Sequence, residues 1–420
     1  MSKKIKILTI SDHPLMPSGV ATQTKYFIEG LLKTGKYKVI SLGGAIKHQN
    51  YQPVRTEEWG ENWTIYPVDN FGDPNIIRSV LRSEKPDILW FMTDPRFYTW
   101  LWGMANEIRA LVPMVYYHVW DNYPYPTYNK PFYDSNDTIV AISKVTEDIV
   151  RTVSPDIECH YLPHAIDPKL FFPMQEEEIL RTRKAHFPNM KDDAMVLFWN
   201  SRNARRKQPG AIIWWFKEFL DKVGHDKAVL LMHTNPKDPN GPDLEAILKE
   251  LKLDNGSVLF SNQATPPEHL RLMYNMADVT ISASDAEGFG LSTLESLNCG
   301  TPIIVPRTGG LQEQVTDGVD TFGVMIEPAS QSIIGSQEVP FIYEDRIAGK
   351  DFIAALESIL TLSRAERKAL GSKGRAHALK NYGFESYQKG WDGILTKVYE
   401  ERGSWENRKK YSRWTLKEVK

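Results

Sequence analysis

The chain has 420 residues, which is too many for one ordinary hydrophobic core, so two domains are expected. Its 51 Lys and Arg residues nearly balance its 53 Asp and Glu residues, and this balance gives no overall attraction to nucleic acid or to an anionic membrane. The two cysteines fit no metal-ligand spacing and suit a reducing compartment rather than a disulfide scaffold. We find neither a leader-like apolar segment at the start nor a run that could span a bilayer, so the sequence predicts a cytoplasmic protein.

Short apolar segments alternate with amphipathic stretches along both halves of the chain. Strands are predicted in the first half at 5–10, 38–41, 87–92, 114–119 and 138–143, and in the second half at 195–199, 228–233, 257–261, 279–283 and 302–306. Several of these runs are continuously apolar, which is typical of parallel strands buried on both faces. Helices are predicted between them, for example at 21–32, 210–222 and 267–277. Repeated strand–helix–strand units predict an α/β protein with doubly wound parallel sheets.

The two halves are expected to meet where Pro163, Pro168 and Pro173 punctuate the chain. We therefore predict one Rossmann-like domain over residues 1–170 and a second over 171–385. Ligands of such domains lie at the carboxyl ends of the strands, and two domains that face each other enclose a cleft.

Residues 386–420 differ from both halves. Apolar residues at helical spacing predict a helix that packs back across the seam between the domains, and a basic tail with interleaved aromatic residues follows it: Trp405, Tyr411 and Trp414. A second interpretation of this tail, contact with an anionic surface such as the inner face of a membrane, stays open. Residues 329–343 are predicted to be a loop insertion.

The most informative segment runs from Glu287 to Glu295 and reads EGFGLSTLE. It follows a predicted strand, and a glycine-rich turn leads directly into a helical pattern. Strand, turn and helix N-terminus together form a binding place for phosphate. A carboxylate one turn inside the helix can accept hydrogen bonds from a sugar beside that phosphate, and a carboxylate before the turn can reach another sugar. The segment therefore predicts a nucleotide-sugar site.

With these residues in place, the sequence resembles the retaining glycosyltransferases of family 4, which have the GT-B fold. The resemblance covers about residues 5–385 and is most specific between 287 and 313. The segments that carry it are 284–295, 299–304, 309–313, Arg202 with Lys207, 17–20, His118 and 162–167. It implies two Rossmann-like domains that face a central cleft, with the acceptor on the first and the donor on the second.

The resemblance also implies roles for single residues. Arg202 and Lys207 would stabilise the negative charge of the departing diphosphate, Glu295 would bind the ribose, and Glu287 would bind the transferred sugar. Backbone groups and loop residues would complete the donor site: Gly19, Ser284, Phe289, Gly290, Leu291 and Ser292. We expect no cofactor and no metal ion, since the two cations supply the charge that a metal would otherwise supply. Glu313 is expected to brace a loop.

The acceptor side is less defined. His118 ends a predicted strand, where either a structural role or contact with the transferred sugar fits. Asp121, Tyr123 and Tyr125 lie in an aromatic, proline-rich loop that either stacks on an acceptor or only packs. Departures from the family pattern are Ser18-Gly19, Gln208-Pro209, and two extra cations, Arg205 and Arg206, beside the phosphate-binding residues.

The sequence thus predicts a metal-independent retaining hexosyltransferase. Its donor would be a nucleoside-diphosphate sugar of the UDP-glucose or GDP-mannose type. Its acceptor would be a hydroxyl on a glycan, a glycolipid or another cell-envelope precursor. Alternatives are glycosylation of a nucleic-acid base or a protein, a GT-B phosphorylase or epimerase, and a non-catalytic relative that binds sugar nucleotides.

Overall fold

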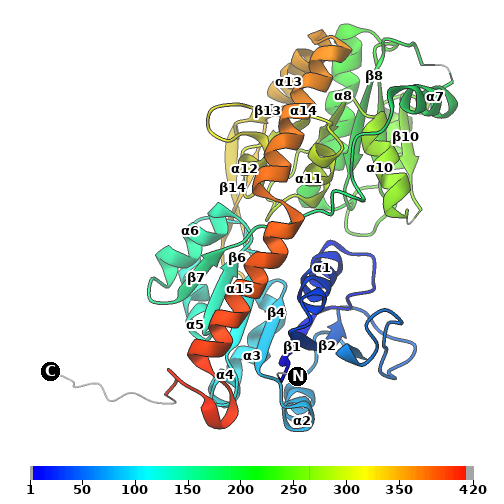
Figure 1. Cartoon of the computed structure of the whole chain (residues 1–420). Helices are drawn as coiled ribbons and strands as arrows, with labels where there is room; N and C mark the ends of the chain where they lie inside the picture. Colours follow the sequence, from blue (N-terminus) through cyan, green and yellow to red (C-terminus); the bar gives the residue numbers. More distant parts are fainter. Residues whose placement is uncertain (1–2, 189, 264, 413–420) are drawn as a thin grey trace. The chain divides into compact units, whose positions relative to one another are not determined.

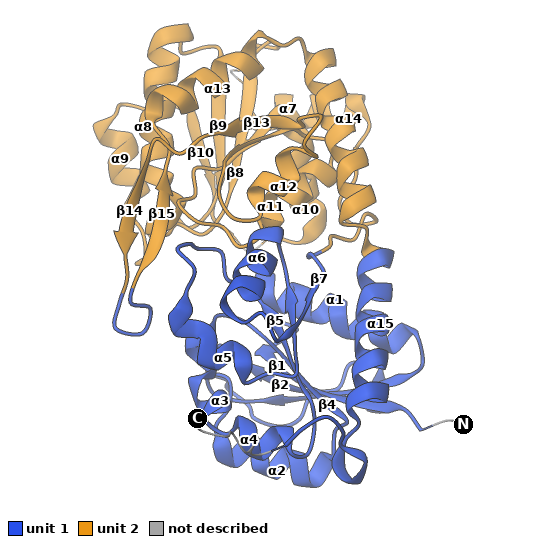
Figure 2. Cartoon of the chain, turned by 90° about the vertical axis from the view of Figure 1, so that its left-hand side faces the viewer, with its two compact units in different colours: residues 1–164, 336–340, 385–420 blue, residues 165–335, 341–384 orange. Residues whose placement is uncertain are grey.

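The computed structural model describes residues 3–188, 190–263 and 265–412, and the chain forms two compact units (Figures 1 and 2). Unit 1 comprises residues 1–164, 336–340 and 385–420, and unit 2 comprises residues 165–335 and 341–384. The chain therefore enters unit 2 after His164 and returns to unit 1 at Glu385.

Unit 1 is built on a parallel sheet with the strand order β3-β2-β1-β4-β5-β6-β7. Its strands are β1 (Ile5–Asp12), β2 (Tyr37–Gly44), β3 (Trp63–Pro67), β4 (Ile88–Met92), β5 (Met114–His118), β6 (Thr138–Ala141) and β7 (Glu158–Tyr161). Its α-helices are α1 (Gly19–Lys33), α2 (Pro74–Glu84), α3 (Thr99–Gly103), α4 (Ala105–Arg109), α5 (Lys130–Asp134), α6 (Lys144–Val153) and α15 (Phe384–Arg402). The strand order changes direction beside β1, as in doubly wound folds.

The end of the chain completes the core of unit 1. Trp391 of α15 is fully buried, and its ring packs edge-on against Phe27 at 4.9 Å and Tyr117 at 4.8 Å between centroids. Beyond the helix, the Trp405 indole N–H donates to the Pro86 carbonyl at 2.8 Å, and Arg408 pairs with Asp137 at 2.6 Å. The described part of the basic tail is therefore packed on unit 1, whereas Trp414 lies outside the described residues.

Unit 2 contains a second parallel sheet with the order β10-β9-β8-β11-β12-β13. Its strands are β8 (Met195–Asn200), β9 (Ala228–His233), β10 (Val258–Ser261), β11 (Val279–Ile281), β12 (Ile303–Pro306) and β13 (Gly323–Ile326). Its α-helices are α7 (Glu176–His186), α8 (Pro209–Val223), α9 (Leu244–Glu250), α10 (Pro267–Met276), α11 (Leu291–Asn298), α12 (Leu311–Val315), α13 (Gly349–Thr361) and α14 (Arg364–Asn381). The α/β class and the two Rossmann-like sheets expected from the sequence are confirmed.

The segment predicted as a loop insertion over 329–343 is instead part of a β-hairpin, so that prediction was wrong. Strands β14 (Ser330–Ile334) and β15 (Ile342–Arg346) pair antiparallel, with Ser330 opposite Arg346. The hairpin was missed because its strands are short and only half-buried, without a continuous apolar run.

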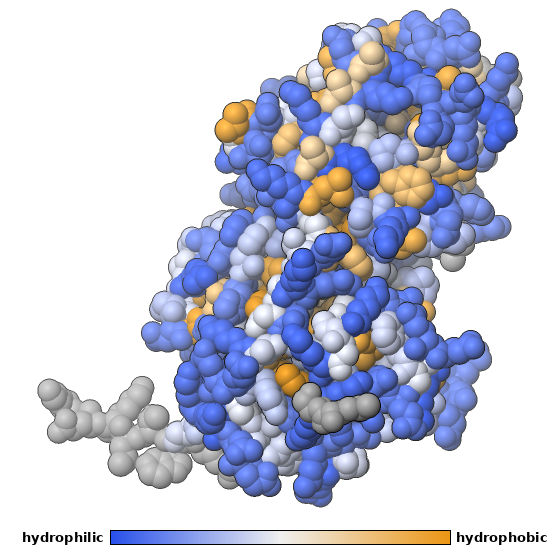
Figure 3. All heavy atoms as spheres, viewed as in Figure 1, coloured by the Kyte–Doolittle hydropathy of each residue, from blue (hydrophilic) through white to orange (hydrophobic). Residues whose placement is uncertain are grey.

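Figure 3 shows hydrophilic residues over most of the viewed face, with apolar residues scattered among them. Among the helices that the structure describes, none is long and apolar enough to cross a membrane.

Candidate functional site

The turn that precedes α11 is held in a conformation that favours glycine. Gly290 has φ +92°, in the left-handed region, and a Cβ atom there would lie 2.5 Å from Leu311 Cδ2 and 2.7 Å from Thr293 Oγ1. The Gln314 amide supports the turn from α12 by donating to the Phe289 carbonyl at 2.7 Å. Glycine at position 290 is thus required by both backbone and packing, as the sequence pattern suggested.

A second glycine turn lies directly against the first. The Gly310 backbone N–H donates to the Glu287 carbonyl at 3.1 Å, and a Cβ atom on Gly310 would lie 2.7 Å from the Gly288 carbonyl oxygen. The two turns pack backbone to backbone, which leaves Leu291 and Ser292 as the first residues of α11. Because the residue before them is a glycine, no side chain caps this helix N-terminus, and its N–H groups suit an anion.

Lys207 lies beside this turn. It ends a short 3₁₀ segment (Arg205–Lys207) after β8, and its ammonium group forms an ion pair with the Glu287 carboxylate. Both side chains are largely buried, with exposed fractions of 12% and 18%. The neighbouring Arg206 donates to the Ala286 carbonyl and lies 3.8 Å from the same Glu287 carboxylate. Two predicted site residues 80 positions apart are thus in direct contact.

Arg202 occupies a different environment. Its guanidinium pairs with Asp238 at 2.7 Å, and its side chain is 65% exposed. The structure therefore ties Arg202 to the loop after β9, whereas Lys207 and Arg206 lie at the glycine turn.

Glu295 lies one turn inside α11, as predicted, and a tyrosine holds it. The Tyr274 hydroxyl donates to the Glu295 carboxylate at 2.6 Å and accepts from the Asn200 amide at 2.8 Å, which links the helix to the end of β8. Burial raises the pKa of Glu295 to about 7, against the opposing effect of the Tyr274 hydrogen bond. Tyr274 carries no recognisable sequence signal, since it reads as an ordinary buried residue of α10.

Ser284 and Asp285 lie in the loop after β11 and are both buried. Ser284 shares a hydrogen bond with the Ser282 hydroxyl at 3.1 Å. Asp285 accepts a hydrogen bond from the Gln208 side chain at 2.7 Å, and burial raises its pKa to about 6. Asp285 and Gln208 are contacts of the turn that sequence analysis did not assign to the site.

Glu313 braces a loop through its backbone. Its carbonyl accepts hydrogen bonds from the Tyr382 hydroxyl at 2.7 Å and from His377 Nε2 at 2.9 Å. The support expected at this position is therefore present, although the backbone provides it.

The remaining predicted residues lie in unit 1. His118 is completely buried, shares a hydrogen bond with the Tyr133 hydroxyl at 2.8 Å, and has its pKa lowered to about 3 by burial, so its ring is neutral. Its Nδ1 has no hydrogen-bond partner among the described residues. Gly19 is the first residue of α1, after Ser18, whose side chain caps the helix and donates to Asp12 at 2.6 Å.

The aromatic loop of unit 1 is fastened to α6. The Tyr123 and Tyr125 hydroxyls both donate to one oxygen of Asp148, at 2.8 and 2.9 Å, and their rings meet edge-on at 5.3 Å. Tyr125 is still 40% exposed. The two rings and Asp121 thus share one short loop, stiffened by its tie to a helix.

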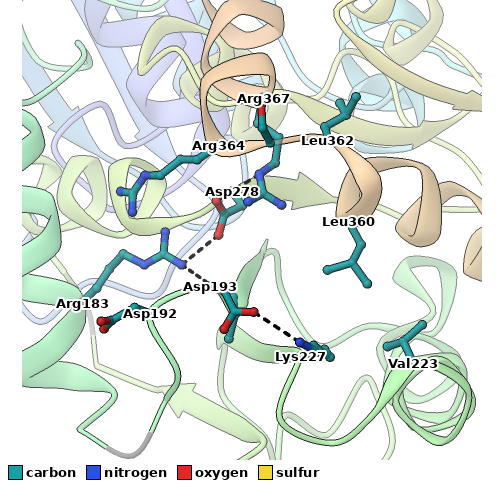
Figure 4. Close-up of a pocket in the computed structure, with 12 residues that line it drawn as sticks. Arg183, Asp192, Asp193, Val223, Lys227, Asp278, Leu360, Leu362, Arg364 and Arg367 are labelled. Atoms are coloured by element: carbon teal, nitrogen blue, oxygen red, sulfur yellow. Dashed lines mark hydrogen bonds and ion pairs between the residues drawn. The ribbon is translucent and has the colours of Figure 1, made fainter.

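A pocket of about 430 Å³ opens at the opposite, N-terminal edge of the unit 2 sheet (Figure 4). Most of its charged side chains are paired: Asp278 binds Arg183 at 2.9 Å and lies 3.4 Å from Arg367, and Asp193 binds Lys227 at 3.2 Å. The two contacts of Asp278 brace α7 and α14 against the sheet, so we assign this pocket a structural role. Among the described residues, no group of three His, Cys, Asp or Glu side chains is placed to hold a metal ion.

Residues 189–376 match the family described as glycosyl transferases group 1. The matched range lies almost entirely within unit 2. The matched range contains the Gly290 turn, the Lys207–Glu287 pair and Glu295. The resemblance drawn from the sequence is confirmed at the level of this family.

Relatives of this chain are found among bacterial glycosyltransferases. D-inositol 3-phosphate glycosyltransferase of Geodermatophilus obscurus is 29% identical over 204 residues, which are 47% of this chain and 39% of that protein. Alpha-monoglucosyldiacylglycerol synthase of Streptococcus pneumoniae is 24% identical over 265 residues, 63% of this chain and 54% of that protein. The alignments thus cover about two fifths to one half of these relatives.

Solved structures resemble the fold of this chain over almost its whole length. Sucrose-phosphate synthase from Thermosynechococcus elongatus superposes with a TM-score of 0.74 at 16% identity, over 94% of this chain and 100% of that chain. Anabaena HepE, solved in complex with UDP-glucose, superposes with a TM-score of 0.69 at 15% identity, again over 94% and 100%. The expected GT-B fold is confirmed by these superpositions.

Proposed function

We propose that this protein is a retaining glycosyltransferase of the family 4 type that moves a hexose from a nucleoside-diphosphate sugar to an acceptor hydroxyl, without a metal ion. The observation that carries the proposal is the contact between Lys207 and Glu287 at the glycine turn that opens α11. A cation, a carboxylate and a helix N-terminus meet there, and these groups suit a ligand in which a diphosphate is joined to a sugar.

The reaction breaks the bond between the sugar C1 and the diphosphate oxygen, and it forms a bond between C1 and the acceptor oxygen. Negative charge grows on the departing diphosphate. Lys207, Arg206 and the N–H groups of Leu291 and Ser292 would stabilise this charge where it develops. Family resemblance supports retention, in which the departing phosphate oxygen takes the acceptor proton on the same face of the sugar.

Two carboxylates would set the pose of the donor. Glu287 would accept hydrogen bonds from hydroxyls of the transferred sugar, and Glu295 would accept them from the ribose. Lys207 would then lie between the sugar carboxylate and the diphosphate. Arg202 is assigned a more distant part in diphosphate binding, since Asp238 holds it and its side chain is mostly exposed.

We infer the classes of donor and acceptor from the names of similar proteins. The Anabaena HepE complex supports a donor of the UDP-glucose type, and a GDP-mannose type donor is the alternative. The name of the Streptococcus pneumoniae relative gives a glycolipid as its product and so supports a lipid acceptor, beside the broader class of glycans, glycolipids and cell-envelope precursors. A lipid acceptor would bring this protein to the inner face of the membrane.

The test is transfer by the purified protein from UDP-glucose or GDP-mannose to candidate acceptor lipids and glycans. Free nucleoside diphosphate is measured by chromatography, and the anomeric configuration of the product is read by proton NMR. We expect turnover that EDTA leaves unchanged and a product that keeps the donor's α configuration. Inverted product refutes retention, turnover abolished by EDTA refutes metal independence, and donor binding without transfer or hydrolysis indicates a non-catalytic relative.

A further inference from the structure

Charged residues of the β14–β15 hairpin contact the turn that carries Lys207. The Arg205 guanidinium forms a two-point ion pair with the Glu344 carboxylate, with N–O distances of 2.8 and 2.6 Å. Glu344 lies on β15, and its side chain is only 3% exposed. Such two-point pairs fix geometry as well as charge.

The contacts continue from Glu344 back to the other end of the same turn. Arg346 of β15 binds Glu344 at 2.9 Å and Asp285 at 3.2 Å. Asp285 in turn accepts a hydrogen bond from Gln208 at 2.7 Å. Because Arg205 and Gln208 are the two ends of one four-residue turn, these contacts form a closed ring around it.

Backbone contacts join the hairpin to the neighbouring loops as well. The Asp345 N–H donates to the Asp285 carbonyl and the Asp285 N–H donates to the Arg206 carbonyl, both at 2.8 Å. The Thr308 hydroxyl donates to the Asp345 carboxylate at 2.7 Å, beside the second glycine turn. One hairpin thus holds three loops that meet at the candidate donor site.

We propose that Glu344 and Arg346 are positioning residues that fix the turn over 205–208 and thereby place Arg206 and Lys207 for the diphosphate. This inference rests on the proposed function. Three consecutive cations repel one another, so the turn needs a counter-charge to stay compact. Of the three cations of the turn, Arg205 is the one that pairs with Glu344, whereas Arg206 and Lys207 lie at the glycine turn. Arg205 and Arg206, the two extra cations beside the phosphate-binding residues, therefore have different roles: Arg205 pairs with the hairpin, and Arg206 lies at the glycine turn.

The test is a double-mutant cycle on transfer kinetics. We expect Glu344→Gln to lower kcat roughly 10- to 100-fold, since small misplacements of catalytic groups cost this much, with little change in the KM for the donor. In a Lys207→Ala background, Glu344→Gln should lower kcat by a clearly smaller factor than in the wild-type protein, because part of its effect acts through Lys207. Arg205→Lys, which keeps the charge and loses the two-point geometry, should also lower kcat.

The matched control is Glu357→Gln, which breaks a surface ion pair with Lys222 elsewhere in unit 2 and should leave kcat unchanged. Each variant's thermal unfolding is measured alongside its kinetics. A Glu344→Gln protein with lower stability and wild-type kcat overturns the inference, and so do independent, multiplicative effects of Glu344→Gln and Lys207→Ala. Absence of transfer by the wild-type protein, in contrast, counts against the proposed function and is recognised before any variant is compared.

Discussion

Replacing Lys207 with alanine removes the cation that contacts Glu287 and that we place beside the departing diphosphate. Loss of one preorganised donor to developing negative charge costs about 2.7–4 kcal/mol in the transition state, so kcat should fall roughly 10²- to 10³-fold. Among the described residues, the largely buried Glu287 would then keep Arg206, at 3.8 Å, as its one ion-pair partner. Leaving a buried charged group poorly paired should lower the free energy of unfolding by about 1–3 kcal/mol.

The assay is steady-state transfer or donor hydrolysis by Lys207→Ala, with urea unfolding to measure its stability. Lys227→Ala is the matched control, because Lys227 also pairs with a carboxylate but lies at the opposite edge of the unit 2 sheet. We expect the control to keep wild-type kcat. A folded Lys207→Ala protein whose kcat stays within about threefold of wild type would refute the assignment of charge stabilisation to this lysine.

Three further predictions concern Gly290, the contact between Glu295 and Tyr274, and the pocket residue Asp278. Gly290→Ala should destabilise the protein by roughly 1–3 kcal/mol in urea unfolding, since the new methyl group would meet Leu311 in a strained backbone; unchanged stability would contradict this. Because the pKa of Glu295 is about 7 and its ionised form accepts hydroxyl hydrogen bonds, UDP-glucose affinity measured by calorimetry should rise up to about tenfold from pH 6 to 8. Glu295→Gln should abolish that rise, and Tyr274→Phe should shift it to higher pH; a pH response that persists in Glu295→Gln would assign it elsewhere. Asp278→Ala removes the carboxylate partner of two buried guanidinium groups and should lower the free energy of unfolding by about 3–5 kcal/mol. A loss below about 1 kcal/mol would refute the bracing role.

The strands that sequence analysis found and those it missed differ in their place in the sheets. All ten predicted strands are present, and nine of them are interior strands, buried on both faces and therefore continuously apolar. Three of the missed strands, β3, β7 and β13, lie at sheet edges, where one side is unpaired and the apolar signal is shorter. Edge strands need tertiary information that a local pattern does not contain.

In the candidate site too, the sequence predicted the features that depend on neighbouring residues and missed a contact between distant ones. The Gly290 turn and the position of Glu295 follow from local chemistry, since a glycine with positive φ and a carboxylate one helical turn later are both readable in the sequence. The partner of Arg205 is not readable, because Glu344 is 139 residues away on a hairpin that resembles a loop. The roles of Arg202 and His118 stay predictions. Arg202 pairs away from the turn, and the buried, neutral His118 fits a structural part as well as a catalytic one.

Residues 385–420 return to unit 1, and this has a consequence for how the protein folds during synthesis on the ribosome. Unit 1 lacks Trp391 at its centre until about 220 residues of intervening chain, between His164 and Glu385, have been made. At about 5–20 residues per second, that interval lasts roughly 11–44 s. Throughout it, the side chains that Trp391 covers, Phe27, Trp90 and Tyr117, lack their final neighbour. The first unit to begin synthesis is therefore the last to be finished, and chaperones have a defined window in which to shield it.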